Sequence, residues 1–276
     1  MRMNQFYRGK TIIITGASYG IGRSMAIRYS NFDCNIVIAS RSIIELEKVA
    51  IQVRENGSNC LAVQCDITKE EDLLLLVKKT LSAYKTIDLL INNVGVTSRF
   101  LIKKASTQVL RDLMEVNFWG AVELTLLCLP HIEKSKGSIV SISSVIGKVP
   151  VPGRSGYSAS KHALEGFFET LRMENLETDI DIIVIRPSYT KTKTRINAVT
   201  ETGQEQKYST LDEDKLLSPE EASRQIIHAI YRKKHGYTLG KKMEGGWLIT
   251  LYALLPKLIS RLIVKKIKIE KHSLFK

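Results

Sequence analysis

The sequence has few of the residues on which small extracellular proteins and metal proteins depend. Only four of its 276 residues are cysteines, and they lie far apart, mostly in apolar stretches. This spacing excludes a disulfide framework and shows no metal-ligand pattern, so we expect no metal site. Reduced, buried thiols are typical of a cytoplasmic compartment. Residues 1–10 are polar, and we expect no secretory signal there.

Acidic residues are scarce near the C-terminus. The net charge is +13, and residues 231–276 contain twelve Lys or Arg against two Glu, a net +10 that leaves +3 for the rest of the chain. The basic character therefore belongs to the tail and not to the body. No recognisable nucleic-acid-binding module accompanies it, so we expect no nucleic-acid partner.

The tail, residues 241–276, also lacks an apolar run long enough to span a bilayer, because Trp247 to Leu255 is too short. After Pro256, one helical face would carry Leu258, Ile259, Leu262 and Ile263, and a basic stripe would carry Lys257, Arg261 and Lys265. Such a helix suits a membrane surface. It equally suits packing on the body or on another subunit, and the sequence leaves both interpretations open.

The first 240 residues read as one folded domain. Hydrophobic residues make up 44% of the chain and charged residues 25%, and no linker or repeat interrupts it. Strands are predicted at 10–14, 35–39, 61–65, 88–91, 138–143 and 181–186, and helices at 22–31, 43–56, 68–84, 107–133, 157–177 and 218–233. Thr68 to Glu71 offers a capping box, and Pro130 is expected to loosen the long helix. The alternation predicts an α/β fold, a doubly wound parallel sheet with helices on both faces, and a polar loop at 191–217.

A glycine-rich turn follows the first strand and opens a helix. It reads Thr15-Gly16-Ala17-Ser18-Tyr19-Gly20-Ile21-Gly22. Glycines in this context let the backbone approach a pyrophosphate, and a helix N-terminus offers unpaired N–H groups to it. The alternative interpretation is a plain tight turn.

The end of the second strand bears on the choice of nucleotide. An NAD site usually has an acid there for the ribose 2′-hydroxyl, whereas this chain has Ser40 and Arg41. An arginine can pair with the 2′-phosphate of NADP, so we favour NADP(H) over NAD(H). Arg41 could also be only a solvated residue at a helix start. Asp66-Ile67 and Asn92-Asn93-Val94-Gly95 follow two further strands, at the ends where α/β sheets bind ligands.

Tyr157 and Lys161 are four residues apart, on one face of a predicted helix. A lysine ammonium near a phenol favours the phenolate and lowers the pKa of the tyrosine, which then can exchange a proton with a substrate oxygen. Ser144, at the end of the fifth strand, could reach the same oxygen. A chance pair on a surface helix is the alternative interpretation.

Taken in order, these motifs resemble those of the short-chain dehydrogenases/reductases over residues 8–240. The glycine turn, Asn92 to Gly95, Asn117 on the long helix, Ser144 and Tyr157-x-x-x-Lys161 all stand at the spacing of that family. The resemblance implies a Rossmann-type catalytic domain and homo-oligomers, dimers or tetramers, formed through helices near 107–133 and 157–177.

The resemblance also implies roles for single residues. Tyr157 would be the general acid in reduction, Lys161 would lower its pKa and hold the nicotinamide ribose, Ser144 would bind the substrate carbonyl, and Asn117 would anchor a water chain to Lys161. Asp66 would contact the adenine, Asn93 would pack near the adenosine ribose, and Thr192 would meet the nicotinamide carboxamide. Ile67, Gly95 and Pro187 are further residues expected to bind the cofactor.

Three positions depart from the family pattern. Val94 stands where alanine is usual, and Ser188 replaces a glycine after the sixth strand. Tyr19 stands where many NADP-using members have a basic residue. The preference for NADP therefore depends mainly on Arg41.

The predicted function is NADP(H)-dependent interconversion of a carbonyl and a secondary alcohol by hydride transfer. Residues 145–152 with Phe100 would form an apolar wall, and the tail favours a lipophilic substrate or membrane association. No cation is clearly placed for a substrate carboxylate, although Arg99, Lys191, Lys193 and Arg195 are candidates. A scaffold protein that docks on membranes through the basic tail is the alternative, which the complete set of catalytic residues disfavours.

Overall fold

The computed structural model describes residues 2–208, 216–240, 246–269 and 274–275, with only the backbone of residue 104. Seven strands form one sheet in the order β3-β2-β1-β4-β5-β6-β7, and every neighbouring pair is parallel. The strands are β1 (Thr11–Thr15), β2 (Asn35–Ser40), β3 (Asn59–Gln64), β4 (Leu89–Asn92), β5 (Ser138–Ile142), β6 (Asp181–Arg186) and β7 (Tyr237–Thr238). The predicted parallel α/β sheet is confirmed, and the two-residue β7 is a strand that the sequence pattern did not reveal.

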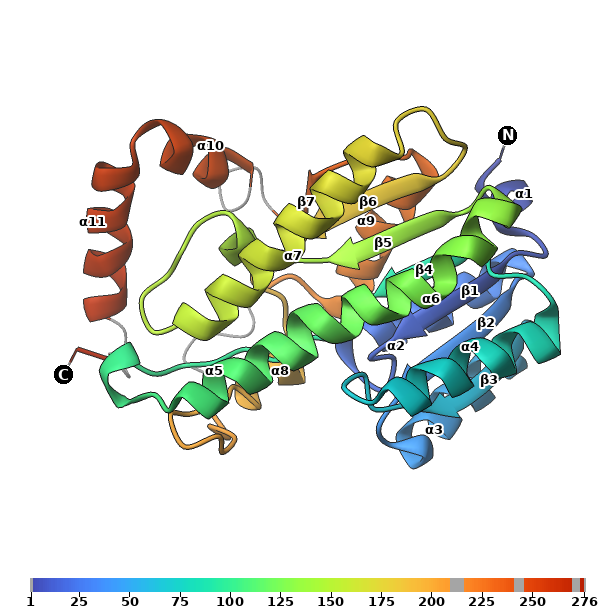
Figure 1. The fold of residues 1–276 in the computed structure, drawn as a ribbon, viewed down its shortest axis with the longest axis horizontal. Helices are drawn as coiled ribbons and strands as arrows, with labels where there is room; N and C mark the ends of the chain where they lie inside the picture. The colour runs from blue at the N-terminus through green and yellow to red at the C-terminus, as the bar shows by residue number, and fades with distance from the viewer. Residues whose placement is uncertain (1, 209–215, 241–245, 270–273, 276) are drawn as a thin grey trace.

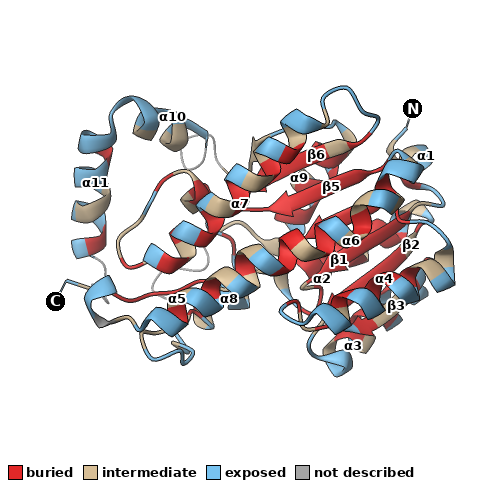
Figure 2. Cartoon of the chain, viewed as in Figure 1, coloured by how far each residue is buried: buried red, intermediate tan, exposed pale blue. Residues whose placement is uncertain are grey.

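Helices cover both faces of this sheet (Figure 1). One face carries α2 (Gly20–Tyr29), α3 (Ile43–Glu55) and α9 (Pro219–Tyr231); the other carries α4 (Glu70–Tyr84), α6 (Gly120–Ser135) and α7 (Ser155–Glu174). Shorter helices are α1 (Met3–Tyr7), α5 (Thr107–Met114) and α8 (Lys193–Ile196), and the tail adds α10 (Gly246–Leu254) and α11 (Pro256–Lys268). Each face has its own apolar core, so the strands are buried on both sides (Figure 2).

The long helix predicted at 107–133 is interrupted, but not at Pro130. The chain forms a π-helical turn at Glu115–Trp119 between α5 and α6, and α6 continues through Pro130. The run from 107 to 135 is the one described helix long and apolar enough to cross a membrane by length and composition. Leu124, Cys128 and Ile132 are nevertheless fully buried in the core, as in a core helix.

The capping box predicted at Thr68 is wrong. Lys69 is the N-cap of α4 without a side-chain hydrogen bond. The Thr68 hydroxyl instead donates to Asp66 Oδ1 at 2.9 Å, because Asp66 competes for it in the preceding turn.

A buried ion pair fixes α7 to the sheet. Glu165 on α7 is 2% exposed and accepts hydrogen bonds from Nε and Nη2 of Arg186 at the end of β6, the shortest at 2.6 Å. Arg186 also donates to Glu169 and to the Gly236 carbonyl beside β7. Because every polar atom of this cluster has a partner, the pairing sets how far α7 lies along β6.

The helices of the tail stand at one end of the molecule, beside the loop that leads into α7 (Figure 1). No residue of α10 is buried, and in α11 only Ile259 and Ile267 are. Leu258, Ile259 and Leu262 were predicted to lie on one face of this helix. In the structure Leu258 and Leu262 are exposed to solvent, whereas Ile259 between them is buried. The predicted boundary at residue 241 lies outside the described residues.

Candidate active site

The glycine turn is built around close backbone contacts. Gly16 and Gly20 have positive φ angles of 65° and 56°, which favour glycine. A side chain on Gly22 would collide with the Gly16 carbonyl. Tyr19, the N-cap of α2, makes no side-chain capping bond, so the first N–H groups of α2 stay available to a ligand. Ser18 and Ile21 lie within this turn, and the arrangement fits a dinucleotide pyrophosphate.

Asn93 holds the turn from the neighbouring strand. Its Nδ2 donates to the carbonyls of Thr15 and Gly16, at 2.9 and 3.2 Å, and its backbone N donates to Thr15 Oγ1 at 3.0 Å. Val94 follows, and one of its methyl groups would lie 3.3 Å from a Cβ on Gly16. The valine that departs from the family pattern therefore narrows the space beside the turn.

The end of β2 lies next to the glycine turn. The Ser18 hydroxyl donates to the Ser40 hydroxyl, so two neutral groups occupy the place where an NAD site carries an acid. Arg41 is exposed, and its guanidinium makes no ion pair with any described residue. It is free to meet a phosphate.

Tyr19 is covered by a cation from a distant segment. Lys193 Nζ of α8 lies 3.8 Å from the centre of the Tyr19 ring, a cation–π contact. The ammonium of Lys193 therefore lies next to position 19, where the sequence itself has a tyrosine. An acid is also close: burial raises the pKa of Tyr19, and Glu45 raises it further by its charge and hydrogen bond.

Asp66 and Ile67 follow β3 but touch none of the other predicted site residues through their side chains. Asp66 Oδ1 accepts from the backbone N and hydroxyl of Thr68, and Ile67 is buried in the core. The Ile67 carbonyl lies against Gly120, which leaves no room for a side chain there. This segment could therefore bind an adenine ring mainly through its backbone groups and through the other carboxylate oxygen of Asp66.

Ser144 and Tyr157 lie near each other. Ser144 ends the segment after β5, and its hydroxyl accepts from the Ile146 backbone N at 3.3 Å. Its side chain also lies close enough to the Tyr157 phenol, on the first turn of α7, to lower the pKa of Tyr157. One substrate oxygen could therefore accept hydrogen bonds from both hydroxyls.

The expected effect of Lys161 on Tyr157 is not found. Burial raises the pKa of the Tyr157 phenol above its ordinary value, and the cation that opposes this is Arg154. Lys161 Nζ lies 6.0 Å from the centre of the Tyr157 ring and donates instead to the Ile142 carbonyl at 3.0 Å. The lysine therefore faces the sheet, one turn below the phenol.

Lys161 is itself strongly affected by its surroundings. It is 2% exposed, and burial lowers the pKa of its ammonium to about 8, while the charge of Glu165 opposes this. Glu165 stands four residues further along the same face of α7, so its carboxylate compensates part of the cost of a buried ammonium.

Asn117 lies in the π turn and is 1% exposed. Its Oδ1 accepts from Val96 N at 2.7 Å, and its Nδ2 donates to Val96 O and to Ser160 Oγ, at 2.8 and 3.0 Å. Gly95 lies between Asn117 and Lys161, because a Cβ on Gly95 would be 3.3 Å from Lys161 Nζ and 3.5 Å from Asn117 Oδ1. The structure thus brings Asn117, Gly95 and Lys161 together.

The chain after β6 returns to the glycine turn. A Cβ on Gly20 would lie 3.0 Å from the Thr192 methyl group, so Thr192 lies beside the glycine turn. The Pro187 carbonyl accepts from Val145 N at 3.3 Å. Ser188 is accommodated without a positive φ, since its hydroxyl faces Gly240, which has no side chain.

Part of the apolar wall predicted for the substrate belongs to the core. Phe100 and Val149 are 2% and 1% exposed, and Phe100 packs with Val109 and Leu113 in a separate small cluster. Internal packing therefore explains these residues, and they give no support to a lipophilic substrate.

A parallel sheet with a glycine turn at its switch point, and a serine, tyrosine and lysine at its carboxyl edge, defines a Rossmann-type oxidoreductase. The family model described as short chain dehydrogenase matches residues 10–203, and the chain belongs to this family.

Relatives extend the match to almost the whole chain. Dehydrogenase/reductase SDR family member 7B of Rattus norvegicus is 31% identical over 282 residues, covering 99% of this chain and 86% of that protein. An 11-beta-hydroxysteroid dehydrogenase of Pinus massoniana is 38% identical, covering 71% of this chain and 56% of that protein. The crystal structure of a Burkholderia phymatum short-chain dehydrogenase/reductase in complex with NAD has a TM-score of 0.79 at 21% identity, over 91% and 95% of the two chains, and confirms the fold.

Several site residues were not found from the sequence. Thr15 and Ser160 orient the two asparagines through their hydroxyls, and only the fold brings them there. Glu165 could have been recognised, because it continues the four-residue spacing from Tyr157 through Lys161. Arg154 precedes Tyr157 by three residues, but no pattern distinguishes it from a surface arginine.

The pKa of Lys161 makes a prediction about stability. Since this pKa falls from 10.5 in the unfolded chain to about 8 in the folded one, the unfolded state binds more protons between these pH values. The free energy of unfolding of the wild type, minus that of Lys161→Met, should therefore rise by about 3 kcal/mol from pH 7 to 10.5. Denaturant unfolding across this range measures it, with Lys79→Met on the exposed side of α4 as control. A difference that stays flat or falls with pH would contradict the burial of a charged Lys161.

Proposed function

We propose that the protein is an NADP(H)-dependent oxidoreductase that interconverts a carbonyl and a secondary alcohol. The observation that carries the proposal is the closeness of Ser144 to Tyr157, whose pKa it lowers, one helical turn from the buried Lys161. Two hydroxyls converge there at the carboxyl edge of the sheet, next to a turn that fits a pyrophosphate. The bound nicotinamide would supply or accept the hydride.

The residues of the chain would manage the oxygen and its proton. In reduction, Ser144 donates a hydrogen bond to the substrate carbonyl and Tyr157 gives it a proton; in oxidation, Tyr157 takes the proton back. Arg154 holds a positive charge three residues before Tyr157, which favours the phenolate that remains. Asn117 is locked between Val96 and Ser160, so it can orient a water molecule near Lys161 without moving itself.

The cofactor would lie along the carboxyl edge from the glycine turn to α7. Gly16, Gly20 and Gly22 would accept the pyrophosphate, and Thr192 would cover it. Ser40 and Arg41 favour the 2′-phosphate of NADP, because neither repels it and the guanidinium can bind it bidentately. Lys193 beside Tyr19 adds a second cation, while Glu45 opposes the preference.

Tyr157→Phe removes only the phenolic oxygen. We expect turnover to fall by about 100- to 10,000-fold, the usual contribution of a general acid. NADPH affinity, followed by nucleotide fluorescence, should stay close to that of the wild type. Tyr84→Phe on α4, away from the site, is the matched control. Turnover at the wild-type rate in Tyr157→Phe would disprove the mechanism.

Arg41→Ala tests the preference for NADP. Loss of a charge-assisted pair with the 2′-phosphate should weaken NADPH binding by about 10- to 100-fold and change NADH binding by less than about twofold. Arg54→Ala at the far end of α3 serves as control. If the wild type binds NADH as tightly as NADPH, the NADP preference is wrong although the oxidoreductase proposal stands.

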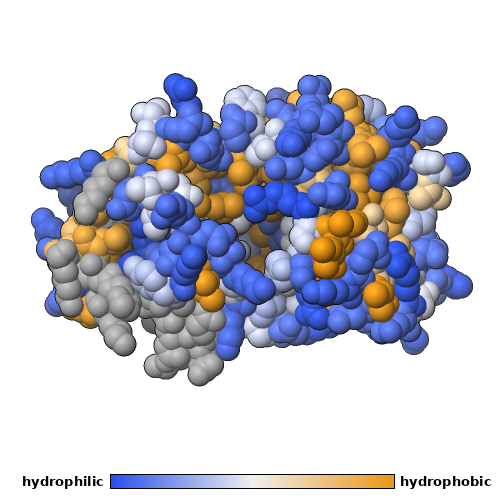
Figure 3. Space-filling model, turned by 90° about the horizontal axis from the view of Figure 1, so that it is seen from below, coloured by the Kyte–Doolittle hydropathy of each residue, from blue (hydrophilic) through white to orange (hydrophobic). Residues whose placement is uncertain are grey.

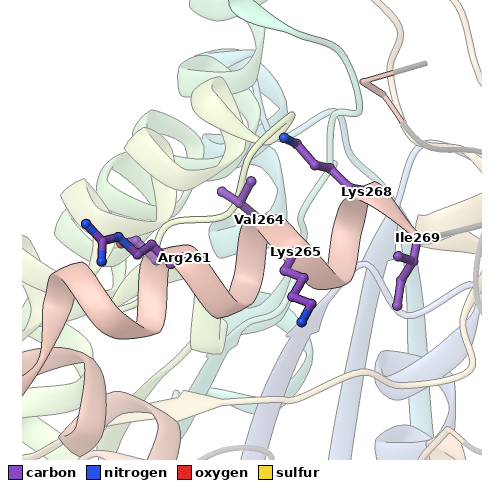
Figure 4. Close-up of a pocket in the computed structure, with 6 residues that line it drawn as sticks. Arg261, Val264, Lys265, Lys268 and Ile269 are labelled. Atoms are coloured by element: carbon purple, nitrogen blue, oxygen red, sulfur yellow. The ribbon is translucent and has the colours of Figure 1, made fainter.

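We also propose that the tail docks the enzyme on anionic membranes and that the substrate is lipophilic. Exposed apolar side chains follow one another through α10 and α11, with exposures from 40% to 72% (Trp247, Leu251, Leu254, Leu255, Leu258 and Leu262). Elsewhere the surface in Figure 3 is mostly hydrophilic with separate apolar patches. Arg261, Lys265 and Lys268 project from successive turns of α11, with Val264 between them (Figure 4). A helix of this kind is stable at an anionic lipid surface.

The tail also touches the segment that leads into the catalytic helix. A Cβ on Gly153 would overlap the side chain of Leu274, so Leu274 of the tail packs against Gly153. Gly153 lies four residues before Tyr157 in the sequence. Docking would therefore bring the site close to the bilayer, where lipophilic molecules concentrate. The name hydroxysteroid dehydrogenase carried by one relative refers to a substrate of that kind.

A homo-oligomer is the remaining proposal. Large apolar side chains are exposed along the helices that the family uses for assembly, with exposures of 45% for Trp119, 56% for Leu126 and 62% for Met173. These residues lie on the π-helical turn Glu115–Trp119, on α6 and on α7, and burying them against a second copy would remove them from water.

Vesicle co-sedimentation tests the docking. The wild type should sediment with phosphatidylcholine vesicles that contain phosphatidylserine, and less with phosphatidylcholine alone or at high salt. The triple variant Leu254→Glu, Leu258→Glu, Leu262→Glu should lose this binding and keep NADPH affinity, because all three side chains are at least half exposed. The control is Leu74→Glu with Leu75→Glu on α4. Equal sedimentation of the triple variant would refute the proposal.

A further inference from the structure

Lys161 is held inside the protein by a contact that uses only part of its hydrogen-bonding capacity. Its side chain is 2% exposed, and its Nζ donates to the Ile142 carbonyl at 3.0 Å. An ammonium has three N–H donors, so two remain for a ligand. The free side is that of Gly95, whose missing side chain leaves space next to Nζ. A nicotinamide ribose and a water molecule would accept these two bonds, and loss of the proton would remove one of them.

Glu165 is the acid that acts on this ammonium. It stands four residues after Lys161 on the same face of α7, and it is itself 2% exposed. A Cβ on Gly147 would lie 3.0 Å from both the Glu165 Cγ and the Lys161 carbonyl oxygen, so the two residues border one space. The carboxylate forms its ion pairs with Lys148 and Arg186 and not with Lys161. It therefore acts on the ammonium through space, in surroundings that exclude water and screen little.

Two cations hold the Glu165 carboxylate from different parts of the chain. Nε and Nη2 of Arg186, at the end of β6, donate to it at distances from 2.6 to 3.0 Å. Lys148 Nζ lies 3.3 Å from Glu165 Oε2, and the Lys148 side chain is 37% exposed. Lys148 directly follows the short helix η4 (Val145–Gly147), of which Ser144 is the N-cap. The carboxylate thus connects the buried lysine with the loop that carries Ser144.

The other elements around Lys161 bring it no second acid. The π turn and the segment after β4 contribute neutral groups, those of Asn117 and Gly95. Glu169, the other partner of Arg186, stands one helical turn further from Lys161 than Glu165 does. The charged and titratable groups come from α7, from β6 and from the loop after β5, and they are Arg154, Tyr157, Glu165, Glu169, Arg186 and Lys148.

Resting on the oxidoreductase function proposed above, we propose that Glu165 is a positioning residue, which keeps Lys161 charged and directed to the Ile142 carbonyl so that it can bind the nicotinamide ribose. Arg186 and Lys148 limit this effect, because they share the same carboxylate. Since Lys148 lies on the loop that carries Ser144, the arrangement also makes the charge of Lys161 depend on that loop.

This role has a consequence for the pH dependence of the reaction. Burial lowers the pKa of Lys161 to about 8, and the charge of Glu165 opposes this fall. Burial raises the pKa of Tyr157 above its ordinary value, so the phenol keeps its proton at a pH where the ammonium begins to lose its own. The rate of carbonyl reduction should therefore decline as the pH rises through about 8, with Lys161 as the group that titrates.

A titration that needs no turnover tests the effect of Glu165. Full-length protein made with ¹³Cε-labelled lysine gives NMR signals that follow the charge of each lysine, and the Lys161 signal is the one that Lys161→Met lacks. Its midpoint should fall by at least about one pH unit in Glu165→Gln and stay close to that of the wild type in Glu165→Asp, which keeps the charge. An unchanged midpoint in Glu165→Gln would overturn the inference.

The sign of the shift separates the charge of Glu165 from its packing. A merely structural role predicts a higher midpoint in Glu165→Gln, because a loosened site would admit water and return the pKa of Lys161 toward its ordinary value. Lys148→Met removes a cation beside Glu165 from a partly exposed position, so the midpoint should rise by about half a unit. This variant decides the question if Glu165→Gln does not fold, and a midpoint that stays or falls would count against us. Glu169→Gln is the matched control, and its shift should be less than half that of Glu165→Gln.

The pH profile of kcat/KM connects the titration with the reaction. The substrate is the best ketone of a screen that starts with acetophenone and cyclohexanone, with NADPH as the reductant. The alkaline limb of the profile should move to lower pH in Glu165→Gln and to higher pH in Lys148→Met, in step with the NMR midpoints. A limb that stays in place while the midpoint moves would disprove the role of Glu165 in the reaction. If no ketone is reduced, the oxidoreductase proposal fails, whereas the titration still decides whether Glu165 sets the charge of Lys161.

Discussion

Because α7 presents Tyr157, Lys161 and Glu165 on one stripe, the positions of these three side chains depend on how that stripe is held against the sheet. Arg186 neutralises Glu165, and the Ile142 carbonyl receives the lysine. A buried ammonium is tolerated only because both partners are already in place. The phenol then stands one turn higher, where the end of β5 brings Ser144 to it. An ion pair eight residues further along the same helix thus helps to position the phenol.

The sequence predicted the sheet, its helices and the main site residues because those signals are local. Apolar runs, the glycine turn and the four-residue spacing of Tyr157 and Lys161 each lie within one element. The π turn at Asn117 and the short β7 have no such signal, since neighbouring elements create them. The tuning of Tyr157 was predicted wrongly for the same reason: spacing placed Lys161 near the phenol, but the Ile142 carbonyl directs its ammonium elsewhere, and Arg154 arrives from the segment before the helix.

The positive charges of the chain lie in two different environments. In α11, lysines and arginines lie in water beside exposed leucines, where salt screens them. Arg154 is partly buried and donates to Thr97 and to the Ser98 carbonyl, so salt screens its charge less. Leu274 packs against Gly153, next to Arg154, and so joins the tail to this second environment.

The π turn between α5 and α6 has a consequence for how this chain can vary. A π turn contains one residue more than an α-helical turn, and here the Gly120 N–H reaches back to the Glu115 carbonyl across it. Loss of a single residue between 115 and 119 would return this turn to α-helical geometry, and α6 would keep its rotation about the helix axis because the wider turn had absorbed the extra residue. Leu124, Cys128 and Ile132 would stay on the core face, whereas Asn117, which lies inside the turn, would lose its position against Val96. The π turn therefore serves the placement of Asn117, and the packing of α6 does not depend on it.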